Sequence, residues 1–229
     1  YLEWGEVRNR KGLFFDFSNT ITTEESENQS LDKWISFLNE KYHLGDDAYE
    51  KFVRRRLEKL VEREKNFKTF MQINREVLME YYGIEDISEE EYYLFHEMYL
   101  RLRPDFLKFF NIIKDKFVTG VITDADNIYT KRTMSALGIY GIFDFIVTAE
   151  EVKVPKPDSK IFEEALRRAG YPEKVVYIGD SEKRDIIGAK NMGFIVIKIA
   201  SQPGETAADY VATNFTEVLQ ILESNKIIN

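Results

Sequence analysis

The segment LFFDFSNT at residues 13–20 carries the most informative pattern in the sequence. Bulky apolar residues stand next to one another without alternation, which is typical of a parallel strand buried on both faces. The run ends at Asp16, and small polar residues follow closely behind it. Ligands bind at the carboxyl ends of the strands in open α/β sheets. The position of Asp16 therefore predicts a functional carboxylate.

Three later segments also place polar side chains at the end of an apolar run or at the start of a loop. Thr123 and Asp124 follow an apolar run, and Asp180 follows the run VVYIG. Lys156 lies in the loop between them in sequence, and Asp185 comes a few residues after Asp180. Each segment alone is weak evidence. The combination is strong evidence for one site, because a carboxylate, a hydroxyl, a lysine and an acidic pair follow in this order, each at a strand end or loop start.

Apolar periodicity divides the chain into two kinds of structure. In the second half, predicted strands and helices alternate, which indicates a doubly wound parallel sheet. The strand at residues 13–15 must belong to this sheet, because it would not be stable alone. Between residues 31 and 102, apolar residues recur at helical spacing in four stretches with short connections. We therefore expect an α/β fold, with a sheet domain at 1–21 and 103–229 and an inserted four-helix domain at 22–102.

The composition restricts the class of protein. A chain of 229 residues with 44% hydrophobic and 31% charged residues is typical of a globular protein. Its net charge of -8 argues against a nucleic-acid partner, because phosphate backbones bind basic surfaces. The absence of cysteine excludes disulfides and cysteine-ligated metals. No apolar stretch approaches the roughly 20 residues of a spanning helix, so we expect no membrane contact. The lack of cysteine, together with abundant Lys, Arg and Glu, is typical of a cytoplasmic protein, and we expect a monomer or homodimer.

Together, these segments resemble the four motifs of the haloacid dehalogenase-like (HAD) hydrolase superfamily. The resemblance is to its phosphatase-like branch, which has a helical cap inserted after the first motif. It covers residues 13–20 and about 118 to the C-terminus, whereas 22–102 match the cap only in length and helicity. The resemblance implies a Rossmann-like core, a cap domain at 22–102 and a small phosphorylated substrate.

The resemblance also implies a mechanism, Mg²⁺-dependent phosphomonoester hydrolysis through an aspartyl-phosphate on Asp16. A carboxylate is charged at neutral pH and needs no base to activate it. Lys156 would neutralise Asp16 and stabilise the transition state, and Thr123 with Asp124 would bind the phosphoryl group. The implied metal ligands are all oxygen atoms, which favours Mg²⁺. They are the carboxylates of Asp16, Asp180 and Asp185 and the main-chain carbonyl of Ser18.

Ser18 departs from the family pattern, because phosphatases of this family usually carry a second Asp there, which acts as general acid and base. A serine hydroxyl is a poor acid and base at neutral pH. General acid–base catalysis typically raises a reaction rate 10²–10⁴-fold. We therefore expect a slow phosphatase. Two alternatives stay open. One is a metal-independent 2-haloacid dehalogenase, whose halide leaving group needs no proton. The other is a module that binds phosphate and metal without turnover.

Overall fold

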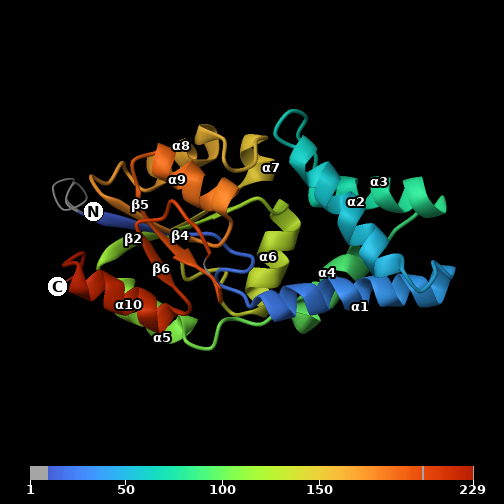
Figure 1. The fold of residues 1–229 in the computed structure, drawn as a ribbon, viewed down its shortest axis with the longest axis horizontal. Coiled ribbons are helices and arrows are strands. Elements are labelled where there is room, and N and C mark those ends of the chain that lie inside the picture. Colours follow the sequence, from blue (N-terminus) through green and yellow to red (C-terminus); the bar gives the residue numbers. More distant parts are fainter. Residues whose placement is uncertain (1–9, 203, 229) are drawn as a thin grey trace.

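The computed structural model describes residues 10–202 and 204–228 (Figure 1). The described residues form a six-stranded, all-parallel sheet with strand order β3-β2-β1-β4-β5-β6. The α/β fold class expected from the sequence is therefore confirmed. The strands are β1 (Lys11–Phe15), β2 (Phe117–Thr123), β3 (Phe145–Thr148), β4 (Val175–Gly179), β5 (Ile195–Ile199) and β6 (Tyr210–Ala212).

The strand order decides where the site lies. From β1 the chain moves outward through β2 to β3, and then crosses to the other side of β1 to build β4, β5 and β6. Phe15 of β1 is in register with Val121 of β2 on one side and with Ile178 of β4 on the other. The residues that follow these three strands are consequently neighbours at the point where the strand order reverses, which is where such sheets bind ligands.

Helices cover both faces of the sheet, as Figure 1 shows. Successive residues of a strand face opposite sides. Leu13 and Phe15 accordingly belong to the core under α5 and α10, whereas Phe14 packs into the core under α8 and α9. Phe15 is in edge contact with Phe106 of α5 at 5.9 Å between ring centroids. The helices of this part are α5 (Phe106–Ile113), α6 (Asn127–Ala136), α7 (Ala149–Val152), α8 (Ser159–Arg168), α9 (Gly188–Asn191) and α10 (Phe215–Ser224).

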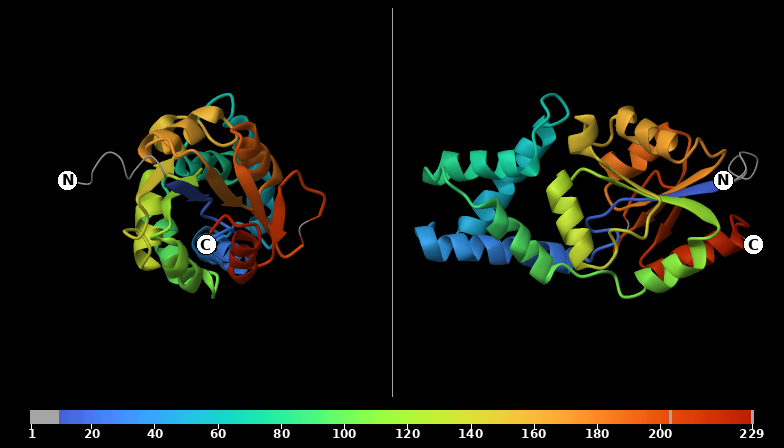
Figure 2. Two further views of the ribbon diagram at one scale, coloured as in Figure 1. Left: turned by 90° about the vertical axis from the view of Figure 1, so that its left-hand side faces the viewer. Right: turned by 180° about the vertical axis from the view of Figure 1, so that it is seen from behind.

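Four further helices between β1 and β2 stand together beyond the carboxyl ends of the strands (Figure 2). Trp34, Phe52 and Tyr92 hold three of them together, with ring centroids 5.6 Å apart for Trp34–Phe52 and 4.8 Å for Trp34–Tyr92. Gly83 ends the third helix with φ 64°, a left-handed conformation that glycine adopts without strain. These helices are α1 (Glu24–Tyr42), α2 (Ala48–Glu62), α3 (Phe70–Tyr82) and α4 (Glu89–Tyr99).

The two segments that join this block to the sheet lie side by side. Thr22 and Leu102 form an antiparallel bridge, and Arg103 N–H donates to Ile21 O at 2.9 Å. The predicted domain boundaries at 21/22 and 102/103 fall on these segments, and the division itself stays a prediction. In the described part of the chain, no helix has the length and hydrophobicity needed to traverse a lipid bilayer.

The segment after β4 begins as a π-helical turn, η2 (Glu182–Ile187), and continues as α9. Ser181 starts the turn, because its carbonyl accepts from both Asp185 N–H and Ile186 N–H. Gly179 permits this turn, since a Cβ there would lie 2.5 Å from Cβ of Asp185. The turn folds Asp185 back over the end of β4.

Candidate active site

Asp16, Thr123 and Asp180 lie at the carboxyl ends of the three central strands. Asp16 directly follows β1, Thr123 is the last residue of β2, and Asp180 directly follows β4. The sheet holds Asp16 in place through its backbone, because Asp16 N–H donates to Ile178 O at 2.9 Å. Three segments far apart in the sequence therefore meet at one edge of the sheet.

Lys156 supplies a fixed positive charge to this edge. Its side chain is only 2% exposed, and Nζ donates to Asp16 Oδ1 at 2.7 Å, Asp185 Oδ1 at 2.7 Å and Ile122 O at 3.0 Å. Nζ also lies 3.2 Å from Tyr177 Oη, so the three N–H groups of the ammonium are shared among four acceptors. Burial opposes the charged form, but the charges of Asp16 and Asp185 outweigh it and raise the pKa of Lys156. The lysine is thus a permanent cation between two carboxylates.

Asp16, Asp180 and Asp185 form a carboxylate cluster, with one oxygen of each within 4.8 Å of the others. Burial and the charges of Asp16 and Asp185 raise the pKa of Asp180 to about 9. The pKa of Asp16 is also raised, by burial and by Asp185. One lysine does not neutralise three carboxylates. Closely spaced carboxylate oxygens with surplus negative charge suit a hard divalent cation, so these residues fit a metal of this kind.

Asp185 is the most firmly held member of the cluster. Oδ1 accepts from Lys156 Nζ and from Tyr177 Oη, each at 2.7 Å, and Oδ2 accepts from Ser181 N–H at 3.1 Å. Burial favours the neutral form, but Lys156 and the hydrogen bond from Tyr177 outweigh it and lower the pKa of Asp185. Asp185 is therefore an ionised carboxylate whose orientation the protein has already fixed.

Thr123 and Asp124 occupy the other side of a small cavity of about 50 Å³, whose lining also includes Asp16, Ser18 and Lys156. Thr123 Oγ1 accepts from Ala125 N–H at 3.2 Å, which leaves the hydroxyl proton free to donate. Asp124 Oδ1 accepts from Lys156 N–H at 2.8 Å. Asp124 therefore contacts the main chain of Lys156 and positions this residue. The structure brings all seven predicted site residues to this edge.

Sequence reasoning missed two residues of the site. Tyr177 is a core residue of β4, and nothing in its apolar surroundings indicates that its hydroxyl reaches both Lys156 and Asp185. Glu27 is an ordinary acidic residue in the first turn of α1 by sequence. Its carboxylate accepts a hydrogen bond from Thr22 Oγ1 at 2.6 Å, and the Ser18 side chain is near enough to lower its pKa. Burial raises the pKa of Glu27 to about 7.

The helical block contacts the sheet domain on the same side as Asp124. Arg63 is buried, and its guanidinium donates to Lys68 O at 2.7 Å and to Asp124 O at 3.0 Å. Asp126 accepts from Phe70 N–H at 2.7 Å and from Met71 N–H at 3.1 Å, at the start of α3. A carboxylate at a helix N-terminus is favourable, so this contact holds the block against the sheet edge that carries the site.

Comparison with known proteins shows the family of the chain. A family model described as haloacid dehalogenase-like hydrolase matches residues 10–193. The chain belongs to this family of hydrolases. A HAD phosphatase from Thermococcus onnurineus is a structural neighbour, with TM-score 0.73, 25% identity and coverage of 93% of this chain and 97% of the neighbour.

Curated relatives within the HAD-like hydrolases carry two kinds of name. The glyceraldehyde 3-phosphate phosphatase of Methanothermobacter thermautotrophicus is 41% identical over 103 residues, which are 44% of this chain and 46% of the relative. The chain therefore spans about half the length of such relatives. The (S)-2-haloacid dehalogenase of Pseudomonas putida is 25% identical over 97% of this chain and 99% of the relative.

Proposed function

We propose that this chain is a Mg²⁺-dependent phosphatase that hydrolyses a small phosphomonoester through an aspartyl-phosphate on Asp16. One observation carries the proposal: Lys156 Nζ lies 2.7 Å from both Asp16 and Asp185, and Asp180 completes an acidic cluster around them. A buried nucleophilic carboxylate, a fixed cation and spare oxygen ligands are the groups that phosphoryl transfer requires. The 41% identity to a glyceraldehyde 3-phosphate phosphatase supports the same reaction class.

In the first step a carboxylate oxygen of Asp16 attacks phosphorus, and the bond from phosphorus to the ester oxygen breaks. Lys156 stabilises the charge that develops, and the hydroxyl of Thr123 donates to a phosphoryl oxygen. Water then attacks the aspartyl-phosphate, which releases phosphate and restores Asp16. We assign Asp16, the Ser18 carbonyl and Asp180 as metal ligands, with Asp185 binding directly or through a water. The bound Mg²⁺ would offset repulsion between Asp16 and the phosphate.

The leaving alkoxide needs a proton, and Ser18 is a weak donor. We propose that Glu27 supplies it through the Ser18 hydroxyl, which is near enough to the Glu27 carboxyl to influence its pKa. In this relay Ser18 Oγ–H protonates the leaving oxygen, and the Glu27 carboxyl returns a proton to Ser18. A carboxyl group whose pKa lies near the working pH is suited to both acid and base roles. The relay has one transfer more than a direct carboxylate, which is consistent with a slow phosphatase.

A second candidate is a metal-independent 2-haloacid dehalogenase. The similarity to the Pseudomonas putida dehalogenase over nearly the whole chain favours it. The acidic cluster disfavours it, because a metal-independent reaction needs no cluster of three acidic side chains around one lysine, whereas a bound cation would offset their mutual repulsion.

Release of inorganic phosphate from an aryl phosphate, with and without Mg²⁺, tests the proposal. We expect Mg²⁺-dependent release that is abolished in Asp16→Asn, which keeps the shape of the side chain and removes the nucleophile. Asp46→Asn, in an exposed turn before α2, is the matched control and should leave the rate unchanged. Chloride release from a 2-haloacid in a metal chelator would establish the dehalogenase instead. If neither product forms and no phosphoenzyme is trapped, the chain is a binding module.

A further inference from the structure

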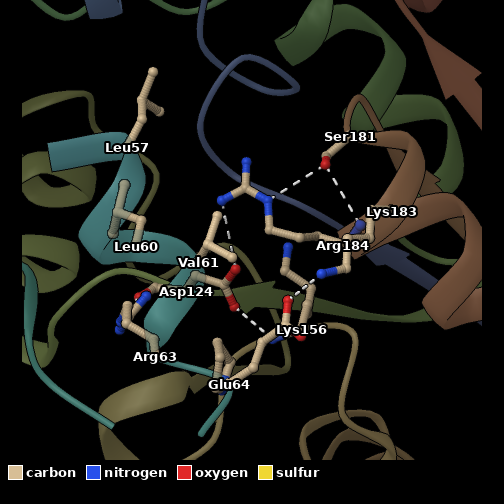
Figure 3. Close-up of a pocket in the computed structure, with 11 residues that line it drawn as sticks. Leu57, Leu60, Val61, Arg63, Glu64, Asp124, Lys156, Ser181, Lys183 and Arg184 are labelled. Carbon is tan, nitrogen blue, oxygen red and sulfur yellow. Dashed lines mark hydrogen bonds and ion pairs between the residues drawn. The ribbon is translucent and has the colours of Figure 1, made fainter. Parts of the chain in front are cut away.

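Two apolar side chains of α2 are exposed beside the candidate active site, and a third is half-buried. Leu57 is 56% exposed and Val61 is 64% exposed, and Leu60 lies between them on the same helix face, since residues three and four apart are neighbours. Figure 3 shows this face across from Arg184 and Lys183 of η2. Leaving such side chains in water forgoes the free energy of burial, so the face is suited to an apolar partner.

This face, which we call the α2 face (Leu57, Leu60 and Val61), forms one wall of a cavity of about 250 Å³. Asp124, Lys156 and Arg184 line both this cavity and the small cavity that contains Asp16. The two cavities therefore lie next to each other and share a wall. A phosphomonoester whose phosphorus lies at Asp16 must direct its alcohol part away from the carboxylates, and the larger cavity is the adjoining space.

The polar groups around the larger cavity are already engaged with one another. Lys183 Nζ pairs with Glu64 Oε1 at 2.5 Å, which joins η2 to the end of α2 and bounds the cavity at its rim. Arg184 donates to Ser181 Oγ at 3.3 Å and lies 3.7 Å from Asp124 (Figure 3). A leaving group rich in hydroxyls would have to compete for these partners, whereas an alkyl chain would not.

We propose that the α2 face is the specificity site for the leaving group, and that the preferred substrates are phosphomonoesters of small aliphatic alcohols. The inference rests on the proposed phosphatase function and adds the substrate class. At roughly 30 Å³ for each water-sized group, the cavity admits a leaving group of about eight non-hydrogen atoms. The phosphoryl group binds at Asp16 and Lys156, and the alkyl chain replaces water against Leu57 and Val61.

Two homologous series test the proposal. The kcat/KM of n-alkyl phosphates from methyl to octyl is measured with Mg²⁺, and the Kd of the corresponding n-alkylphosphonates, which have no ester bond to cleave, is measured by calorimetry. Burying one methylene group increases binding affinity about fourfold. We therefore expect kcat/KM and affinity to rise about fourfold per methylene and to level off near the length that fills the cavity. The kcat/KM of butyl phosphate should exceed that of glycerol phosphate.

Leu57→Asn is the diagnostic variant and Leu94→Asn its matched control. Leu94 is 49% exposed on α4, and neither cavity is lined by it. We expect Leu57→Asn to weaken hexylphosphonate binding about tenfold while methylphosphonate binding changes less than twofold, and Leu94→Asn to change neither.

The outcomes separate the inference from the function. Affinity and kcat/KM that do not vary with chain length, or a preference for glycerol phosphate over butyl phosphate, would overturn the specificity site and leave the phosphatase intact. A chain-length dependence that Leu94→Asn reduces as much as Leu57→Asn would also overturn it. If phosphonates bind as expected but no ester is cleaved, the binding site stands and the phosphatase function fails.

Discussion

Replacing Asp180 by asparagine tests the electrostatics of the carboxylate cluster in the metal-free protein. Asp16, Asp180 and Asp185 crowd around the single cation of Lys156. Burial and its two carboxylate neighbours raise the pKa of Asp180 to about 9. The side chain therefore retains a proton at neutral pH that the unfolded chain releases near pH 4.

The sign and the size of the effect follow from this proton. Between about pH 4 and about pH 9 the folded protein binds one proton more than the unfolded chain, so stability falls as the pH rises. The slope approaches about 1.4 kcal/mol per pH unit. At pH 7 the accumulated cost is at most about 4 kcal/mol, and solvent reduces it because Asp180 is partly exposed. Asparagine removes this cost, so Asp180→Asn should stabilise the metal-free protein by about 2–4 kcal/mol.

Urea unfolding in a metal chelator at pH 5, 7 and 8.5 measures the difference in the free energy of unfolding between Asp180→Asn and the wild-type protein. We expect the gain in the free energy of unfolding to grow with pH, and Asp46→Asn to show no such trend. With saturating Mg²⁺ the wild-type protein should gain stability, whereas Asp180→Asn should gain little, because a ligand is missing. A variant that is less stable than wild type at every pH without metal would refute the electrostatic reasoning.

Two further variants test proton transfer at Ser18. Ser18→Asp should raise the turnover of an alkyl phosphate roughly 10- to 100-fold and leave that of an activated aryl phosphate nearly unchanged, since only the alkoxide needs a proton. If wild type and Ser18→Asp turn over the alkyl ester equally fast in steady-state kinetics, Ser18 does not limit proton transfer. Glu27→Gln should slow alkyl ester hydrolysis about 100-fold in the Ser18 protein but not in the Ser18→Asp protein, because the introduced carboxyl would donate the proton without the relay. Equal losses of hydrolysis rate in both proteins would mean that Glu27 has a structural role.

The sheet and the helical block could be predicted from local pattern. The run Leu13 to Phe15 has no polar alternation, which favours a strand covered on both faces. In residues 31–102 the apolar spacing is that of helices, and Gly83 ends one of them. The order of the motifs also predicted that Asp16, Lys156 and Asp185 gather at one place. Their catalytic roles stay predictions that the assays above address.

The tertiary structure alone decided which partners each of these groups has. Glu27 reaches Ser18 because α1 starts close behind the connection after β1, and Tyr177 reaches Lys156 because β4 pairs directly with β1. The raised pKa of Asp180 and the exposed face of Leu57 arise likewise from the packing of segments distant in the sequence. Periodicity records which side of a strand or helix is apolar, a local property. Burial, charge coupling and cavity shape depend on distances between elements, which only the folded chain fixes.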